Sequence, residues 1–102
     1  MSYDSIVKML RKFVLCEQYS FVDRLANATS KEVVEAALYE ALRASRVSGE
    51  ICEGVTPYIA NEDEIKELLE VLDRDLNEGL DLAKKIAIKA LSIPVRREGS
   101  KE

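Results

Sequence analysis

The stretch NEDEIKELLEVLDRDLNEGLDLAKKIAIKAL, from Asn61 to Leu91, decides the fold class of this sequence. Apolar residues recur in it every three or four positions, which is the period of an amphipathic helix. Asn61 can cap the start, acidic residues fill the first turn, lysines gather near the far end, and Pro94 stops the pattern. We therefore predict one helix over residues 62–91, about 42 Å long at 1.5 Å per residue.

The same period predicts two earlier helices. The first covers residues 4–27 and the second covers residues 30–48, where Thr29 and Glu32 form a capping box at the start. A connection this short makes the two helices an antiparallel hairpin. Residues 49–60 contain Gly49 and Gly54. They either continue the second helix or form a short helix of their own over residues 51–60.

Together these segments predict an all-α, up-down bundle of three long helices, or four if residues 51–60 form one. The chain has 102 residues, enough for one hydrophobic core. We expect a single domain over residues 1–93, followed by a polar, flexible tail over residues 94–102.

The composition of the chain excludes several classes of partner and catalytic site. The net charge of −4 makes nucleic acid an unlikely partner, and no apolar run is long enough to span a membrane, so we expect a cytoplasmic protein. The sequence has no histidine, which excludes imidazole bases and imidazole zinc sites. Cys16 and Cys52 read as small core residues, with a disulfide left open. One glutamine among many charged residues is typical of a thermophile.

Glu17 raises the sharpest chemical question. Phe13 and Phe21 lie four residues before and after it, so a continuous helix would place the carboxylate on the apolar face. The predicted hairpin brings Glu40 level with Glu17. Inward glutamates on facing helices are also how carboxylate-bridged di-iron (ferritin-like) bundles hold metal, but Arg43 stands where such bundles place a histidine.

Glu17 and Glu40 are therefore candidate ligands for a divalent ion such as Mg²⁺, Mn²⁺ or Ca²⁺. The alternative is a structural role, in which the two carboxylates pair with nearby basic residues: Arg24, Arg43 and Arg46. No other cofactor is predicted, and no nucleophile–base pair indicates an enzyme.

The leading functional hypothesis is a non-catalytic helical module that self-associates or binds a protein partner. Val71, Leu82 and Ile88 fall off the main apolar stripe of the last helix and are candidates for this contact surface. The second hypothesis is the carboxylate metal site. The third is a regulatory or nucleic-acid-associated protein that uses five basic residues: Lys8, Arg11, Lys12, Arg43 and Arg46. Nine acidic residues between Asn61 and Leu82 are read as a solvated face, or else as a surface for a basic partner.

Overall fold

The computed structural model describes residues 3–92 and confirms the all-α class. It contains five helices, in chain order α1 (Asp4–Leu15), α2 (Ser20–Ala26), α3 (Lys31–Val47), α4 (Glu62–Arg74) and α5 (Leu76–Leu91). The bundle thus has more and shorter helices than the three or four predicted. The predicted tail over residues 94–102 lies outside the described residues.

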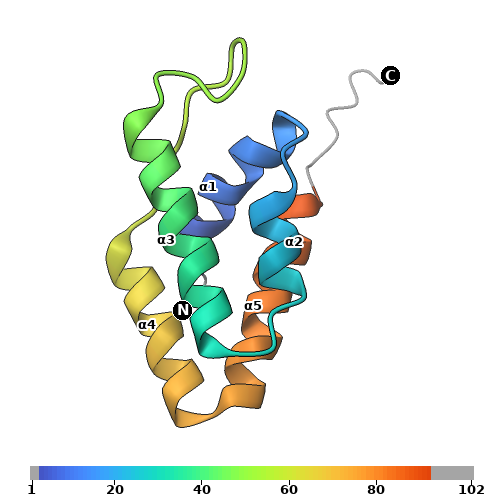
Figure 1. The fold of residues 1–102 in the computed structure, drawn as a ribbon, viewed down its shortest axis with the longest axis vertical. Helices are drawn as coiled ribbons and strands as arrows, with labels where there is room; N and C mark the ends of the chain where they lie inside the picture. Colours follow the sequence, from blue (N-terminus) through green and yellow to red (C-terminus); the bar gives the residue numbers. More distant parts are fainter. Residues whose placement is uncertain (1–2, 93–102) are drawn as a thin grey trace.

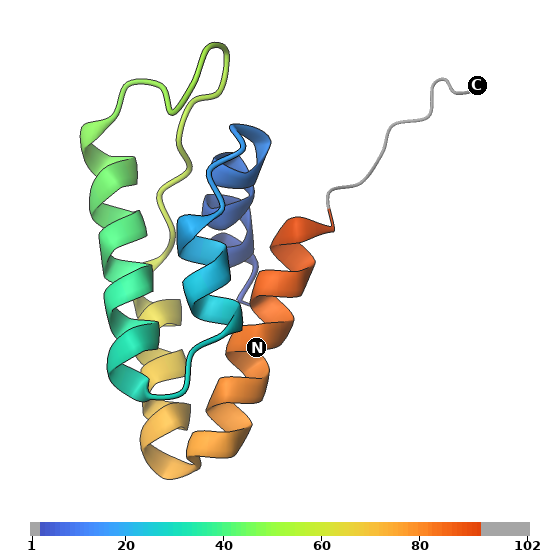
Figure 2. The same cartoon turned by 45° about the vertical axis from the view of Figure 1, so that its right-hand side comes forward.

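The helices alternate in direction through the bundle (Figures 1 and 2). The chain rises in α1, descends in α2, rises in α3, descends in α4 and rises again in α5. The last helix packs against α1, α2 and α4, while α2 also packs against α3. The core forms between them and is drawn from every helix. Within the described residues, no helix is long and apolar enough to cross a membrane.

The predicted helix over residues 62–91 is wrong in its continuity, because it breaks at Asp75. This residue has an extended backbone (φ −151°, ψ 99°) and its side chain accepts a hydrogen bond from the N–H of Glu78, so it caps the start of α5. Its own N–H still donates to the carbonyl of Val71. The chain therefore reverses here, and α4 and α5 form a hairpin (Figure 1).

Gly79 allows the two arms of this hairpin to touch. A Cβ added there would lie 2.5 Å from Cδ2 of Leu72 and 2.8 Å from its Cα. No side chain fits at that distance. Of the apolar residues outside the main stripe, Val71 is buried in the structure.

The predicted first helix also breaks, between Cys16 and Tyr19. The N–H of Gln18 donates to the carbonyl of Phe13, and the N–H of Glu17 donates to that of Val14. These two bonds form a Schellman motif, the common ending in which the chain turns away through a left-handed residue. The reversal brings the rings of Phe13 and Phe21 into edge contact, with centroids 4.9 Å apart. The two phenylalanines do pack together, but across a turn and not along one helix.

The start of α1 is held by the start of α4. Glu64 accepts hydrogen bonds from the N–H of Ser5 (3.1 Å) and from its hydroxyl (2.7 Å). The same hydroxyl oxygen accepts a bond from the N–H of Asn61. Helix ends leave backbone N–H groups without a partner, and here a side chain of another helix satisfies one of them. One glutamate thus fixes two helices that are far apart in sequence.

Residues 49–60 are not helical in the structure. The second predicted helix ends close to where it was expected, because α3 stops at Val47, but the helix predicted over residues 51–60 does not form. Residues 49–60 form a loop at one end of the bundle (Figure 1). A tight turn closes the loop tip, where Ile51 donates to Val55 and Val55 donates to Cys52. Gly54 takes the positive φ of 82° that this turn requires.

A disulfide joins Cys16 to Cys52 and ties this loop to the end of α1. The interpretation of the cysteines as core residues is wrong, because both are only half-buried and they are bonded to each other. The bond closes a chain segment with a sequence separation of 36. In the chain-entropy view, such a loop corresponds to about 4 kcal/mol of stabilisation.

The start of α3 supplies a direct test of the fold. Ser30, and not Thr29 as the sequence pattern indicated, is the N-cap, and its hydroxyl accepts a bond from the N–H of Val33. We expect Ser30→Ala to lower the free energy of unfolding by about 1 kcal/mol, because an N–H at the helix start loses its partner. Thr29→Ala is the matched control and should have no comparable effect. Chemical denaturation of the two variants measures the difference, and an equal loss in both would contradict the assignment of the cap.

Candidate functional site

Glu17 lies in the turn that ends α1, and its side chain is exposed. Its backbone is left-handed, with φ 59°, at the position of the Schellman motif that glycine usually occupies. The prediction of a partly buried Glu17 is therefore wrong. The prediction failed because α1 ends at Leu15, two residues before Glu17. Phe13, Glu17 and Phe21 therefore do not share one face of a continuous helix.

Glu40 lies on the outer face of α3 and pairs with Arg24 of α2 at 2.9 Å. The hydrogen bond from this guanidinium lowers the pKa of Glu40 below its ordinary value. This is the structural alternative of the sequence analysis, in which the carboxylate pairs with an arginine. Across residues 3–92, no group of three or more acidic, cysteine or histidine side chains could hold a metal ion. Glu17 and Glu40 thus belong to no such group among the described residues, and their role as metal ligands stays a prediction.

The three residues proposed as an apolar contact surface have different environments. Val71 is buried and Leu82 is partly buried against the core, whereas Ile88 is 54% exposed. Leu91, one turn after Ile88, is 43% exposed. Residues three apart share a helix face. The apolar surface of α5 is therefore centred on Ile88 and Leu91 near its end.

A basic groove runs along α1. We use this name for the hollow of about 270 Å³ lined by five residues: Lys8, Arg11, Lys12, Leu15 and Tyr58. The first four come from α1, and Tyr58 comes from the loop before α4. The Nζ atom of Lys8 lies 5.6 Å from the centre of the Tyr58 ring, a cation–π distance. The groove combines three cations with an aromatic face.

Arg11 has a structural bond and a spare donor. Its Nη2 donates to the carbonyl of Lys89 at 2.9 Å near the end of α5, and this carbonyl also accepts a bond from the N–H of Ser92. Its Nε is buried without a hydrogen-bond partner in the structure. The other basic residues of this hypothesis are placed elsewhere. Arg46 pairs with Glu62 on α4, and neither Arg43 nor Arg46 lines the groove.

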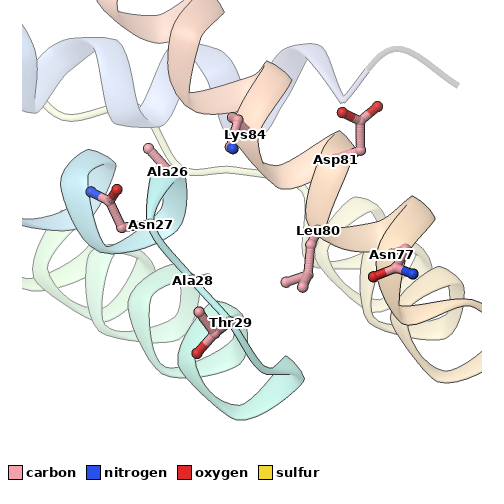
Figure 3. Close-up of a pocket in the computed structure, with 8 residues that line it drawn as sticks. All are labelled: Ala26, Asn27, Ala28, Thr29, Asn77, Leu80, Asp81 and Lys84. Carbon is pink, nitrogen blue, oxygen red and sulfur yellow. The ribbon is translucent and has the colours of Figure 1, made fainter.

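A second hollow, of about 390 Å³, lies between the turn that joins α2 to α3 and the first half of α5 (Figure 3). Leu80 projects across the gap towards Thr29, while Asp81 points away from it. Its polar side chains, on Asn27, Thr29, Asn77, Asp81 and Lys84, are all exposed. The hollow thus gathers no charged cluster or buried polar group that would select a ligand.

Many of the nine acidic residues have structural partners. Glu64 binds Ser5 and Asp75 caps α5, as described above. Three others form ion pairs: Glu62 with Arg46, Asp73 with Lys31, and Asp81 with Lys85. These pairs are exposed and each contributes little stability. The interpretation of a solvated acidic face with local structural roles fits these contacts.

Comparison with known proteins adds a family. Residues 9–59, half of the chain, match the family described as CRISPR-associated protein (Cas_Csa5). The chain belongs to this family. Searches of curated proteins and of solved structures found no match. The matched region of this Cas_Csa5 chain contains both cysteines, α2, α3, and every residue of the basic groove except Lys8.

Sequence reasoning missed Tyr58 as a partner of the basic residues on α1. They are separated by more than forty positions, and only the disulfide-bonded loop brings them together. A weak signal was present, because Cys52 and Tyr58 lie close to each other in sequence and Cys16 follows the basic residues. A predicted disulfide would have indicated the groove.

Glu17 allows a test of its role. We expect Glu17→Gly to raise the free energy of unfolding by about 0.5–1 kcal/mol, because glycine accepts the left-handed backbone that costs other residues energy. Glu17→Gln keeps that backbone cost and removes only an exposed charge, so it should leave stability nearly unchanged. Urea denaturation at neutral pH measures both variants. A large loss of stability in Glu17→Gln would show that the carboxylate has a structural partner.

Proposed function

We propose that this Cas_Csa5 protein is a non-catalytic helical subunit that assembles through the exposed end of α5, first of all with a second copy of itself. Family membership supports a place in a CRISPR system. The observation that carries the assembly role is the exposed apolar pair on α5, Ile88 and Leu91. Exposed apolar residues that adjoin on one helix face often mark a protein–protein interface.

The helix that carries this pair is well suited to present it. The opposite face of α5 is held by Ala83, Ile86, Ala87 and Ala90, all of them buried. Arg11 of α1 also binds the carbonyl of Lys89, one residue beyond Ile88. The backbone beneath the pair is therefore fixed before any partner arrives, which lowers the entropy lost on binding.

Assembly is tested by mass in solution. We expect the wild-type protein to form dimers or larger oligomers at tens of micromolar, and Ile88→Glu to shift it towards monomer by placing a charge in the contact. Val47→Glu is the matched control, because Val47 is 78% exposed at the end of α3 and should not affect the mass. Light scattering across a concentration series gives the result. A wild-type monomer throughout would contradict the proposal.

A second candidate function is contact with single-stranded nucleic acid in the basic groove. Three observations favour it: the cations on α1, the aromatic face of Tyr58 and the buried, unpartnered Nε of Arg11. Phosphates need local positive charge and bases stack on aromatic rings. The net charge of −4 describes the whole chain and not the groove. Many of the acidic residues lie on α4 and α5, whereas the cations of the groove lie on α1.

This candidate predicts a salt dependence. Binding of a fluorescent oligothymidylate should weaken as salt rises, and replacing Lys8 and Lys12 with alanine should flatten the slope by roughly one unit per lost phosphate contact. Tyr58→Ala should weaken binding without changing the slope. Lys66→Ala, an exposed lysine of α4, is the control and should bind as the wild type does. No binding at low salt, or equal losses in all variants, would exclude this function for the groove.

A further inference from the structure

The Cys16–Cys52 disulfide joins two surface turns and not two parts of the core. Cys16 is the C-cap of α1, and Cys52 lies in the tight turn closed by the bond from the N–H of Val55. Both cysteines are half-buried, and neither belongs to the hydrophobic core. Exposed disulfides are open to attack by a thiolate, whereas buried ones are shielded.

Cys16 directly follows one wall of the basic groove, and Cys52 lies in the loop that carries the other wall. Leu15, the last residue of α1 and part of the groove, directly precedes Cys16. On the other wall, Tyr58 follows Cys52 by six residues. The disulfide is therefore the covalent link between the helix that carries the cations and the segment that carries the aromatic ring.

Other contacts hold this segment mainly at its far end. Ala60 is buried, and the N–H of Asn61 donates to the hydroxyl of Ser5. On the near side, α3 ends at the highly exposed Val47. Between these ends, Ile51 and Tyr58 are only partly buried against the core. The disulfide is thus the covalent tether of residues 48–58, beside the packing of Ile51 and Tyr58 against the core.

We propose that this disulfide is a reversible redox latch that fixes the Tyr58 wall of the basic groove. A thiolate of a dithiol protein of the thioredoxin or glutaredoxin class attacks one sulfur and forms a mixed disulfide, and the other cysteine leaves as a thiolate that takes up a proton. The second thiol of the reductant then resolves the mixed disulfide. Cys16 and Cys52 gain two electrons and two protons, and the reductant becomes a disulfide.

The test compares the oxidised chain, the chain reduced by thioredoxin and the double variant Cys16→Ser/Cys52→Ser. Hydrogen exchange is followed at the amides of Ile51 and Val55, which close the loop turn. Nuclear Overhauser contacts among core side chains of α3 and α5 are the internal control. Nuclear Overhauser contacts between Lys8 and the Tyr58 ring report on the groove itself. Neither readout uses nucleic acid, so the latch can fail or succeed independently of the proposed functions.

We expect reduction to speed exchange at Ile51 and Val55 by about tenfold or more, since these amides open with the local loop. The contacts between Lys8 and Tyr58 should be lost, the Overhauser contacts among core side chains of α3 and α5 should persist, and oxidised glutathione should restore the contacts of the oxidised chain. The double variant should match the reduced chain. Unchanged exchange and contacts in a chain with two free thiols would overturn the latch. So would loss of the contacts among core side chains, which would show that the disulfide holds the whole fold together, or resistance of the folded chain to thioredoxin.

Discussion

The close approach of α4 and α5 at Gly79 is the constraint on which the bundle depends. Leu72 occupies the space that a Cβ at position 79 would need, so any other residue there would force Leu72 and its backbone to shift. Closure places α5 against α1, α2 and α4 together. If residues 62–91 were one straight helix, its second half would extend past the shorter helices, and Ala83, Ile86, Ala87 and Ala90 would have no core to enter.

With that hairpin in place, α1 is held at three points by parts of the chain distant in sequence. Glu64 binds its first turn, Arg11 reaches the carbonyl of Lys89, and the disulfide holds its end at Cys16. The first two contacts involve α4 and α5, and the third involves the loop. A helix of 12 residues gains little stability on its own, so its position comes from such tertiary contacts. These contacts also fix most of the basic groove, because four of its five lining residues belong to α1.

The helical class followed from the sequence because the apolar period of three to four residues is strong and glycine and proline are rare. The breaks did not follow, for reasons that particular residues make clear. Leu72, Leu76 and Leu80 keep four-residue spacing across Asp75, so periodicity alone could not show that the chain reverses there. Asp75 and Glu78 do have the spacing of a capping box, and that signal was available. The left-handed Glu17 had no such signal, since the position it fills usually holds glycine.

The basic groove, too, could be predicted only in part from the sequence. Lys8, Arg11 and Lys12 share α1, and a sequence shows that directly, whereas their aromatic neighbour depends on a cross-link that cysteine spacing cannot reveal. The net charge of −4 argued against nucleic acid only because it sums two separate regions. Nine acidic residues lie in or next to α4 and α5, and several are taken up by caps and ion pairs, while the cations of the groove lie on α1. Fields between exposed charges fade over about 10 Å at moderate salt, so a partner at the groove responds to the local charge more than to the total.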